Sequence, residues 1–263
     1  TVTGTGVVQT GDSFFGSLAG SAPASVSSNA TTITIGSDNT STTFSGQLAG
    51  TGGITKVGTG RLTLAGSPLT WGGQTTVSAG VLQIGNGTSG PNSFGTIVVN
   101  GEIDFAGTVP GATVGNLISG TGAVTISGGT VTGIGAAWTH SGPTNVTGGT
   151  VAAGFNTLGP LTVTGTGVVQ TGDSVFGSLA GSAPGSVSSN ATAITIGSNN
   201  ASTTYSGTLG GVGGLTKVGL GTFTLGGTLT MGGPLTINGG RVNLLATGPG
   251  GATVNAGGTL GGT

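Results

Sequence analysis

An internal duplication is the feature that most limits what this chain can fold into. Residues 1–66 return at 162–227, where 52 of the 66 positions are identical and 14 differ. The differences are mild, as in the change from Phe44 to Tyr205, so apolar positions mostly stay apolar. A block that repeats this closely over this length is typical of a modular array and not of a compact enzyme with one site.

Composition narrows the class of protein further. Glycine supplies 62 of the 263 residues, against a usual share of about 7%, and lacks the period of three that collagen requires. Charged residues make up 3% of the chain and the net charge is −1, which gives no footprint for nucleic acid or an anionic membrane. No apolar run approaches the roughly 18 residues of a membrane-spanning helix, so we expect no membrane insertion of this segment. Cysteine is absent, which excludes disulfides and thiolate metal sites.

Short strands closed by glycine are predicted along the whole chain. At 31–35 and 61–64 an apolar residue occupies every second position, as a half-buried strand requires. A shorter signature also recurs, in the order apolar, any, small, Gly, any, apolar; its clear instances contain Gly80, Gly101, Gly129, Gly149 and Gly240. The first four of these glycines are 21, 28 and 20 residues apart, which is about one coil of a β-solenoid.

We therefore predict an all-β fold, a right-handed parallel β-helix (β-solenoid) with about 20 residues per coil. Alternate Val, Ile and Leu side chains should point into a thin core while Thr and Ser point outward. No linker or change of composition interrupts the sequence, so we expect residues 1–263 to form a single continuous solenoid that contains the duplication at an offset of 161 residues.

Residues 52–84 and 213–245 resemble the autotransporter-associated β-strand repeat of bacterial autotransporter passengers. Each segment runs Gly-Gly-aliphatic-Thr-Lys, Gly-x-Gly, Leu/Phe-Thr-Leu, and then Gly-Gly before a Val/Ile-x-x-Gly strand pair. Both depart from the family pattern where Trp71 and Met231 replace an expected tyrosine. The resemblance implies a right-handed parallel β-helix in a large surface or secreted protein that is exported by an autotransporter-like route. In that family the repeat carries no catalytic residues.

Two acidic residues are the best candidates for chemistry. Glu102 and Asp104 are two positions apart on a predicted strand, so both side chains leave the same face. Paired carboxylates could act as general acid and base on a glycosidic bond, or bridge a cation. Because Ile103 and Phe105 alternate with them and point inward, we interpret the pair as a solvated face.

His140 is the only histidine, which excludes a His-rich zinc site. A Ser–His–Asp arrangement would need Asp104 or Asp173 nearby, and no G-x-S-x-G motif accompanies it, so we place His140 at a corner. Trp71 and Trp138 could be exposed platforms for sugar stacking, but large residues that fill the core are the favoured interpretation.

Two further pairs recur in register. Asp12 and Asp173 each stand in Thr-Gly-Asp-Ser, which predicts a turn closed by hydrogen bonds from the backbone to the carboxylate. Lys56 and Lys217 are predicted to lay a solvated stem along the solenoid. Six N-x-S/T sites leave glycosylation open, at Asn29, Asn39, Asn86, Asn145, Asn190 and Asn200.

We assign no catalytic, cofactor-binding or metal-binding residue and no cofactor, and predict that the chain is not an enzyme. The predicted role is an extracellular structural or adhesive stalk, or a fibre-forming segment, of a large repetitive protein at the bacterial cell surface. The first alternative is a polysaccharide-active or glycan-binding β-helix centred on Glu102 and Asp104.

A second alternative is an ice- or surface-binding solenoid, suggested by Thr32 and Thr34, although the second copy has Ala193 beside Thr195. A flat ladder of outward threonines would favour it. The expected partners are other copies, end to end, or flanking repeats, with cell-surface glycans or matrix as further candidates. We expect the native protein to be much longer than 263 residues, or short subunits to stack into a fibre.

Overall fold

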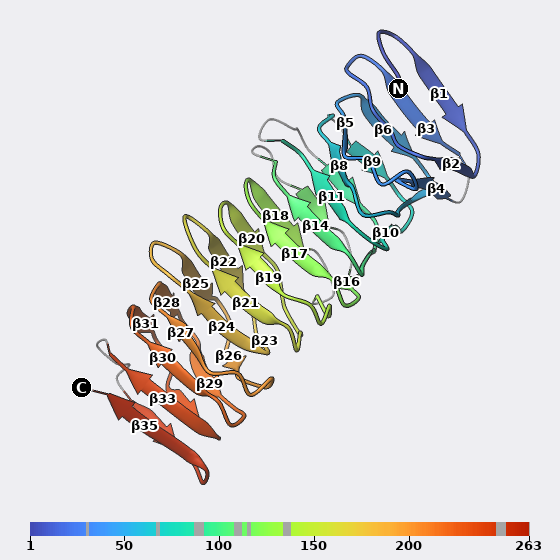
Figure 1. Cartoon of the computed structure of the whole chain (residues 1–263). Coiled ribbons are helices and arrows are strands. Elements are labelled where there is room, and N and C mark those ends of the chain that lie inside the picture. Colours follow the sequence, from blue (N-terminus) through green and yellow to red (C-terminus); the bar gives the residue numbers. More distant parts are fainter. Residues whose placement is uncertain are drawn as a thin grey trace. The chain divides into compact units, whose positions relative to one another are not determined.

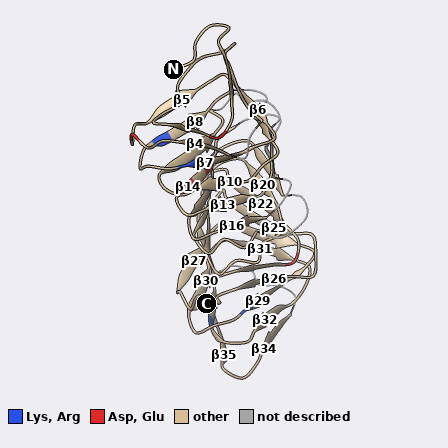
Figure 2. Cartoon of the chain, turned by 90° about the vertical axis from the view of Figure 1, so that its right-hand side faces the viewer, with Lys and Arg blue, Asp and Glu red and all other residues tan. Residues whose placement is uncertain are grey.

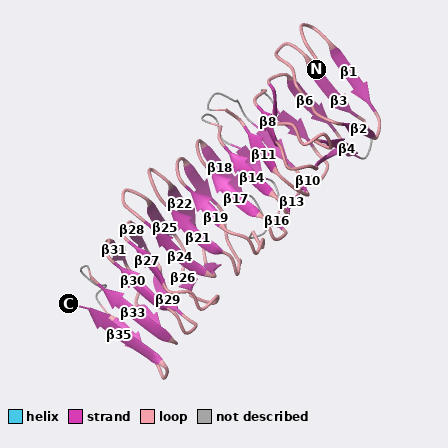
Figure 3. Ribbon diagram, viewed as in Figure 1, coloured by secondary structure: helices cyan, strands magenta, loops and turns pink. Residues whose placement is uncertain are grey.

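The computed structural model describes residues 1–29, 32–66, 69–86, 92–107, 112–114, 117–133, 138–245 and 251–262. These residues form strands and turns and contain no helix, as Figure 3 shows, and so none that is long and apolar enough to span a membrane. The chain divides into two compact units, Thr1–Ala136 and Ala137–Thr263, and each is described by itself. One continuous solenoid over all 263 residues stays a prediction.

The first unit has three faces of parallel strands, visited in turn by the chain (Figure 1). Face 1 contains β1 (Val7–Thr10), β3 (Ser25–Ser28), β6 (Gln47–Gly50), β9 (Leu69–Trp71), β12 (Asn92–Phe94), β15 (Ala112–Val114) and β18 (Thr130–Gly133). Face 2 contains β2 (Ser13–Phe15), β4 (Thr32–Ile35), β7 (Gly53–Lys56), β10 (Thr75–Val77), β13 (Ile97–Val99) and β16 (Ile118–Ser119). Face 3 contains β5 (Thr42–Phe44), β8 (Arg61–Leu64), β11 (Val81–Ile84), β14 (Glu102–Phe105) and β17 (Ala123–Ile126).

The second unit repeats the same plan. Its face 1 contains β20 (Thr150–Ala152), β22 (Val168–Thr171), β25 (Ser186–Ser189), β28 (Thr208–Gly211) and β31 (Thr228–Met231). Face 2 contains β23 (Ser174–Phe176), β26 (Ala193–Ile196), β29 (Gly214–Lys217), β32 (Leu235–Ile237) and β34 (Ala252–Val254). Face 3 contains β19 (Thr144–Val146), β21 (Pro160–Val163), β24 (Ser178–Gly181), β27 (Thr203–Tyr205), β30 (Thr222–Leu225), β33 (Gly240–Leu244) and β35 (Gly258–Gly262).

The register of pairing confirms the parallel β-solenoid and its spacing. On face 3 of the first unit, Leu62 pairs with Leu82 and Leu82 with Ile103, at separations of 20 and 21 residues. All three side chains point into the core and are no more than 2% exposed. Like residues therefore stack on like residues from coil to coil, which is how a chain with so few aromatics obtains a continuous core.

Glycine is required where the backbones of consecutive coils touch. A Cβ atom added to Gly66 would lie 1.7 Å from the carbonyl oxygen of Gly46 in the preceding coil. The same contact recurs in the second copy, where a Cβ on Gly227 would lie 1.9 Å from the Gly207 oxygen. At both positions the neighbour is backbone and cannot rotate away, so only glycine fits.

We predict that Gly66→Ala lowers the free energy of unfolding of the first unit by about 3 kcal/mol, because the added methyl group forces the two coils apart. Gly72→Ala is the matched control, since a Cβ there meets no atom within 4 Å. It should change stability by less than about 1 kcal/mol. The free energy of unfolding of both variants is measured by denaturant unfolding. Equal losses in the two variants would contradict the proposed clash between the added methyl group and the Gly46 backbone.

Candidate functional site

Two buried lysines occupy equivalent places in the two units. Lys56 ends β7 and Lys217 ends β29, and each is 1% exposed. The Lys56 Nζ atom donates to the carbonyl oxygens of Val57 at 2.6 Å, Gly58 at 2.9 Å and Ala79 at 3.3 Å. The predicted solvated stem is therefore wrong: the side chain is folded inward and its ammonium group is enclosed by backbone carbonyls.

The second lysine repeats this arrangement closely. Its Nζ atom donates to the carbonyl oxygens of Val218, Gly219 and Gly239 at 2.5, 3.1 and 3.4 Å. In both copies two acceptors lie in the lysine's own turn and the third lies in the next coil. Desolvation by burial lowers the pKa of Lys56 and of Lys217. Each lysine thus ties two coils together through its ammonium group.

We predict that Lys56→Met, which keeps the apolar stem, lowers the free energy of unfolding by about 1–3 kcal/mol, because three carbonyls lose their donor. Lys217→Met should have an effect of the same size on the second unit, since its contacts are the same. Thermal and denaturant unfolding of each variant makes the measurement. A methionine variant as stable as the parent would show that the ammonium contacts contribute nothing.

Carboxylate and amide side chains also join consecutive coils. The Oδ1 atom of Asp12 accepts a hydrogen bond from the backbone N–H of Thr32 at 2.8 Å, and Asp173 accepts one from Ala193 at the same distance. The predicted turn role for these aspartates is therefore corrected: they bind the backbone of the next coil, 20 residues away. Asn39 does the same at another corner, accepting from the Thr59 N–H at 2.9 Å.

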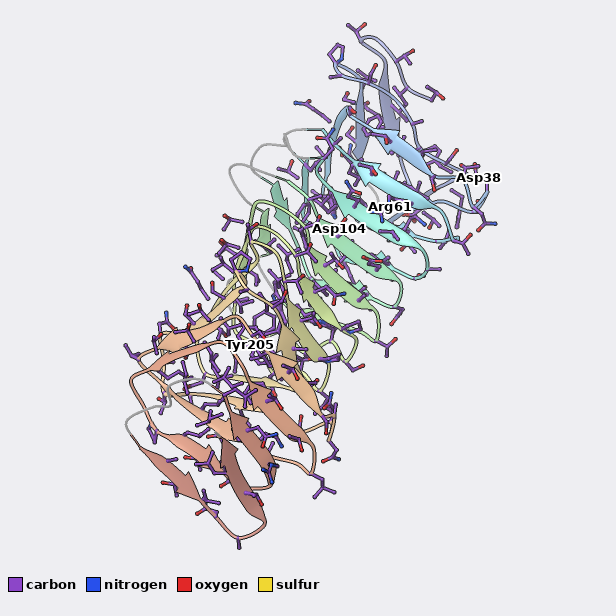
Figure 4. The ribbon with its side chains drawn as sticks, turned by 60° about the vertical axis from the view of Figure 1, so that its left-hand side comes forward. Asp38, Arg61, Asp104 and Tyr205 are labelled. Carbon is purple, nitrogen blue, oxygen red and sulfur yellow. The ribbon has the colours of Figure 1, made fainter. Side chains whose placement is uncertain are left out.

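Several differences between the two copies change the side-chain hydrogen bonds. Asp38 accepts hydrogen bonds from the backbone and hydroxyl of Thr40, and these bonds lower its pKa (Figure 4). In the second copy Ala201 replaces the threonine, so Asn199 accepts only the backbone bond at 3.0 Å, and its amide group donates to the Ser178 hydroxyl at 3.1 Å. The labelled Tyr205 replaces a phenylalanine, and its hydroxyl donates to the carbonyl oxygens of two residues, at 3.0 and 3.2 Å.

The two acidic candidates lie on face 3 of the first unit and are already bonded. Glu102 accepts from the Thr125 hydroxyl at 2.9 Å, and Asp104 accepts from the Ser127 hydroxyl at 2.6 Å. Arg61 forms an ion pair with Asp104 at 3.4 Å (Figure 4). Asp104 is only 8% exposed, so the predicted solvated face is wrong for this residue.

The hydrogen bonds of this polar cluster join consecutive coils, which indicates a structural role. Arg61 also donates to the Gln83 side chain at 2.7 Å, so the cluster joins β8, β11 and β14 to Ser127, which directly follows β17. As predicted, Ile103 and Phe105 point inward, at 1% exposure each. Within the described ranges no three His, Asp or Glu residues lie together as a metal site. Charged residues are few on the described strands, as the blue and red segments of Figure 2 show.

The single histidine is part of the core and not of a surface corner. His140 is 0% exposed, its Nε2 atom lies 2.8 Å from the Thr144 hydroxyl, and its Nδ1 atom has no hydrogen-bond partner. Asp173 is exposed and bonded to the next coil, so these contacts form no Ser–His–Asp arrangement. Trp138 packs against Phe155 with ring centroids 5.1 Å apart.

Both tryptophans fill the core, which confirms the favoured interpretation. Trp138 is 0% exposed and Trp71 is 4% exposed. The Trp71 indole N–H donates to the Thr75 hydroxyl at 2.8 Å, and its ring lies 4.7 Å from that of Phe94. Neither ring presents a face to solvent for sugar stacking.

Burial lowers the pKa of His140 to about 4. The unfolded chain, with an ordinary histidine pKa near 6.5, binds the proton more readily, so stability is lost as the pH falls from about 6.5 to about 4. We predict a loss of about 3 kcal/mol in the second unit over this interval. The free energy of unfolding of the parent and of His140→Gln is measured across this pH range, and the difference between them separates the contribution of His140 from that of the carboxylates. If the variant lost as much stability as the parent over this range, the prediction would be wrong.

A column of threonines runs along the outside of face 2 in each unit. In the first unit the paired residues are Phe14, Thr34, Thr55, Thr76, Val98 and Ser119. In the second unit they are Val175, Thr195, Thr216, Thr236 and Thr253. Neighbours in parallel pairing are about 4.8 Å apart. The outward direction of these threonines agrees with the sequence prediction, and the column is continuous over four coils in the second unit and three in the first.

The column is one residue wide. Beside it Thr32 pairs with Gly53, and Ala193 pairs with Gly214, so the Thr-x-Thr spacing does not continue from coil to coil. The hydroxyls and methyl groups therefore form a line and not a two-dimensional lattice. This geometry supports contact with an extended molecule better than contact with a flat crystalline surface.

The passenger-associated-transport-repeat family matches three segments, residues 54–84, 135–153 and 215–244. The first and third coincide with the segments whose sequence resembles the autotransporter repeat, which confirms that resemblance. The middle segment contains the strand signature around Gly149. The chain thus carries the repeats of an autotransporter passenger. No curated protein and no solved structure matches it.

Proposed function

We propose that this chain is a stalk segment of a large bacterial surface protein, exported by an autotransporter-like route and placed outside the cell. The passenger repeats support export, and the solenoid supports a structural role. The observation that carries the proposal is the use made of charged and polar side chains. Lys56, Lys217, Asp12 and Asp173 each bond to an adjacent coil, at equivalent places in both copies.

The contacts of Glu102 and Asp104 favour a structural role for this pair over a catalytic one. Glu102 accepts a hydrogen bond from Thr125 in β17, Asp104 accepts one from Ser127 directly after β17, and Arg61 forms an ion pair with Asp104. A glycosidase needs one carboxyl group free to protonate the leaving oxygen and a second free to act on the sugar or water. We therefore propose that the chain is not an enzyme and that its adhesive surface is face 2.

Surface display in a Gram-negative host tests the proposal. The chain is fused between an amino-terminal epitope and an autotransporter translocator, and intact cells are probed with antibody and added protease. We expect the epitope on the surface and a chain that resists the protease. The Lys56→Met/Lys217→Met variant should reduce the displayed epitope about threefold, because less stable chains are removed during export.

Thr230→Ala, an exposed change on face 1 of the second unit, is the matched control and should display normally. An epitope that stays inside the cell would contradict export of this segment. A displayed chain that is digested as fast as an unfolded passenger would contradict the stalk. Hydrolysis of a polysaccharide panel by the purified chain, abolished by Glu102→Gln, would replace the proposal with the enzymatic alternative.

A further inference from the structure

A shallow depression of about 620 Å³ lies on face 2 of the second unit, over β23 and β26. Asn156, Asp173, Thr192 and Thr195 supply polar groups to it, and Val175 and Ala193 supply apolar ones. It lies at the first residues of the threonine column, which continues from Thr195 along the face. The residues that join coils on face 3 do not line this depression.

The depression coincides with differences between the two copies. Val175 and Ala193 stand where the first copy has Phe14 and Thr32, and these are two of the 14 changed positions. Phe14 is 84% exposed, so a phenyl group at this position stands out over the face. Val175 and Ala193 are the smaller side chains at these two positions, and both line the depression. The backbone register is the same in both copies, since β2 pairs with β4 as β23 pairs with β26.

The polar groups around the depression define the chemistry of a ligand. Asn156, Asp173 and Thr192 are exposed, and Thr195 is half-buried. Asp173 uses its Oδ1 atom to hold the Ala193 N–H, which fixes the carboxylate and leaves acceptor positions toward solvent. An amide, a carboxylate and hydroxyls are the groups that exchange hydrogen bonds with sugar hydroxyls.

Charge and shape narrow the choice to one class. No Lys or Arg lines the depression, and Asp173 would repel a sulfated or carboxylated sugar. The methyl groups of Val175 and Ala193 provide a small apolar patch for the C–H face of a ring. Along the adjoining column, the hydroxyls of Thr195 and Thr216 can meet further units of an extended chain.

We propose that this depression binds a neutral oligosaccharide. One sugar ring lies over Val175 and Ala193, Asn156 and Asp173 bond its hydroxyls, and the following ring lies along the threonine column. The site does not depend on the stalk role, because binding is a property of the folded second unit and can be measured on purified protein that is never exported.

Titration of the purified chain tests the proposal. The probes are glucose and N-acetylglucosamine oligomers of one to six units, followed by calorimetry and by shifts in amide NMR signals. We expect millimolar affinity that becomes about tenfold tighter as the oligomer reaches the column, with shifted signals at Val175, Ala193 and Thr195.

The decisive variant, here called the filled variant, is Val175→Phe/Ala193→Thr, which enlarges two lining side chains to the residues that the first copy has at these positions. Because the same fold already holds those residues in the equivalent strands, the variant should stay folded, which circular dichroism checks. Its affinity for the oligomers should fall about tenfold or more. Asn156→Ala should weaken binding severalfold, and Thr230→Ala on face 1 should change nothing.

Three results would overturn the proposal. One is the absence of saturable binding of any oligomer up to about 10 mM, well above the expected affinity. Another is equal binding by the filled variant, which would place the ligand elsewhere. The third is equal or tighter binding of dextran sulfate, which would show that charge is not excluded. None of these results bears on surface display, so the stalk proposal is judged separately.

Discussion

Parallel hydrogen bonding between consecutive coils is the interaction on which every other feature of this protein depends. It places each residue directly over its equivalent about one coil earlier, so a favourable or unfavourable contact is repeated down the face. This is why leucine stacks on leucine at Leu62 and Leu82, and why two glycine backbones can touch at Gly46 and Gly66. A chain with 3% charged residues obtains its order from this repetition, with little help from ion pairs.

The polar side chains show how a thin core tolerates charge. The ammonium groups of Lys56 and Lys217 lie among backbone carbonyls at corners, where the strands end and acceptors are free. Burying an unpaired charge is expensive, and three carbonyl partners offset much of that penalty. His140 has no such shell, since one ring nitrogen lacks a partner, and it is held neutral by its surroundings.

The fold class, the coil spacing and the inward direction of residues such as Ile103 and Phe105 could be predicted from the sequence, because alternation and glycine spacing report them directly. The positions of Lys56, Asp104 and His140 could not. Charged and polar residues are normally exposed. Here Lys56 has an acceptor and Asp104 has donors in other coils, while His140 is buried with one ring nitrogen unpartnered, and the sequence pattern reports none of these contacts. The depression over Val175 was equally hidden, since it arises from the size of neighbours on two strands and not from any motif.

The reach of the side-chain bonds has a consequence for how such a protein changes over evolutionary time. Those that join different coils connect residues 17 to 23 positions apart, apart from the pair of Arg61 and Asp104 at 43. Nearly all contacts are therefore made with the next coil alone. Recombination that adds or removes whole coils in register therefore disturbs side-chain bonds only near the junction, so the gene can lengthen or shorten by unequal crossing-over while the rest of the core is kept.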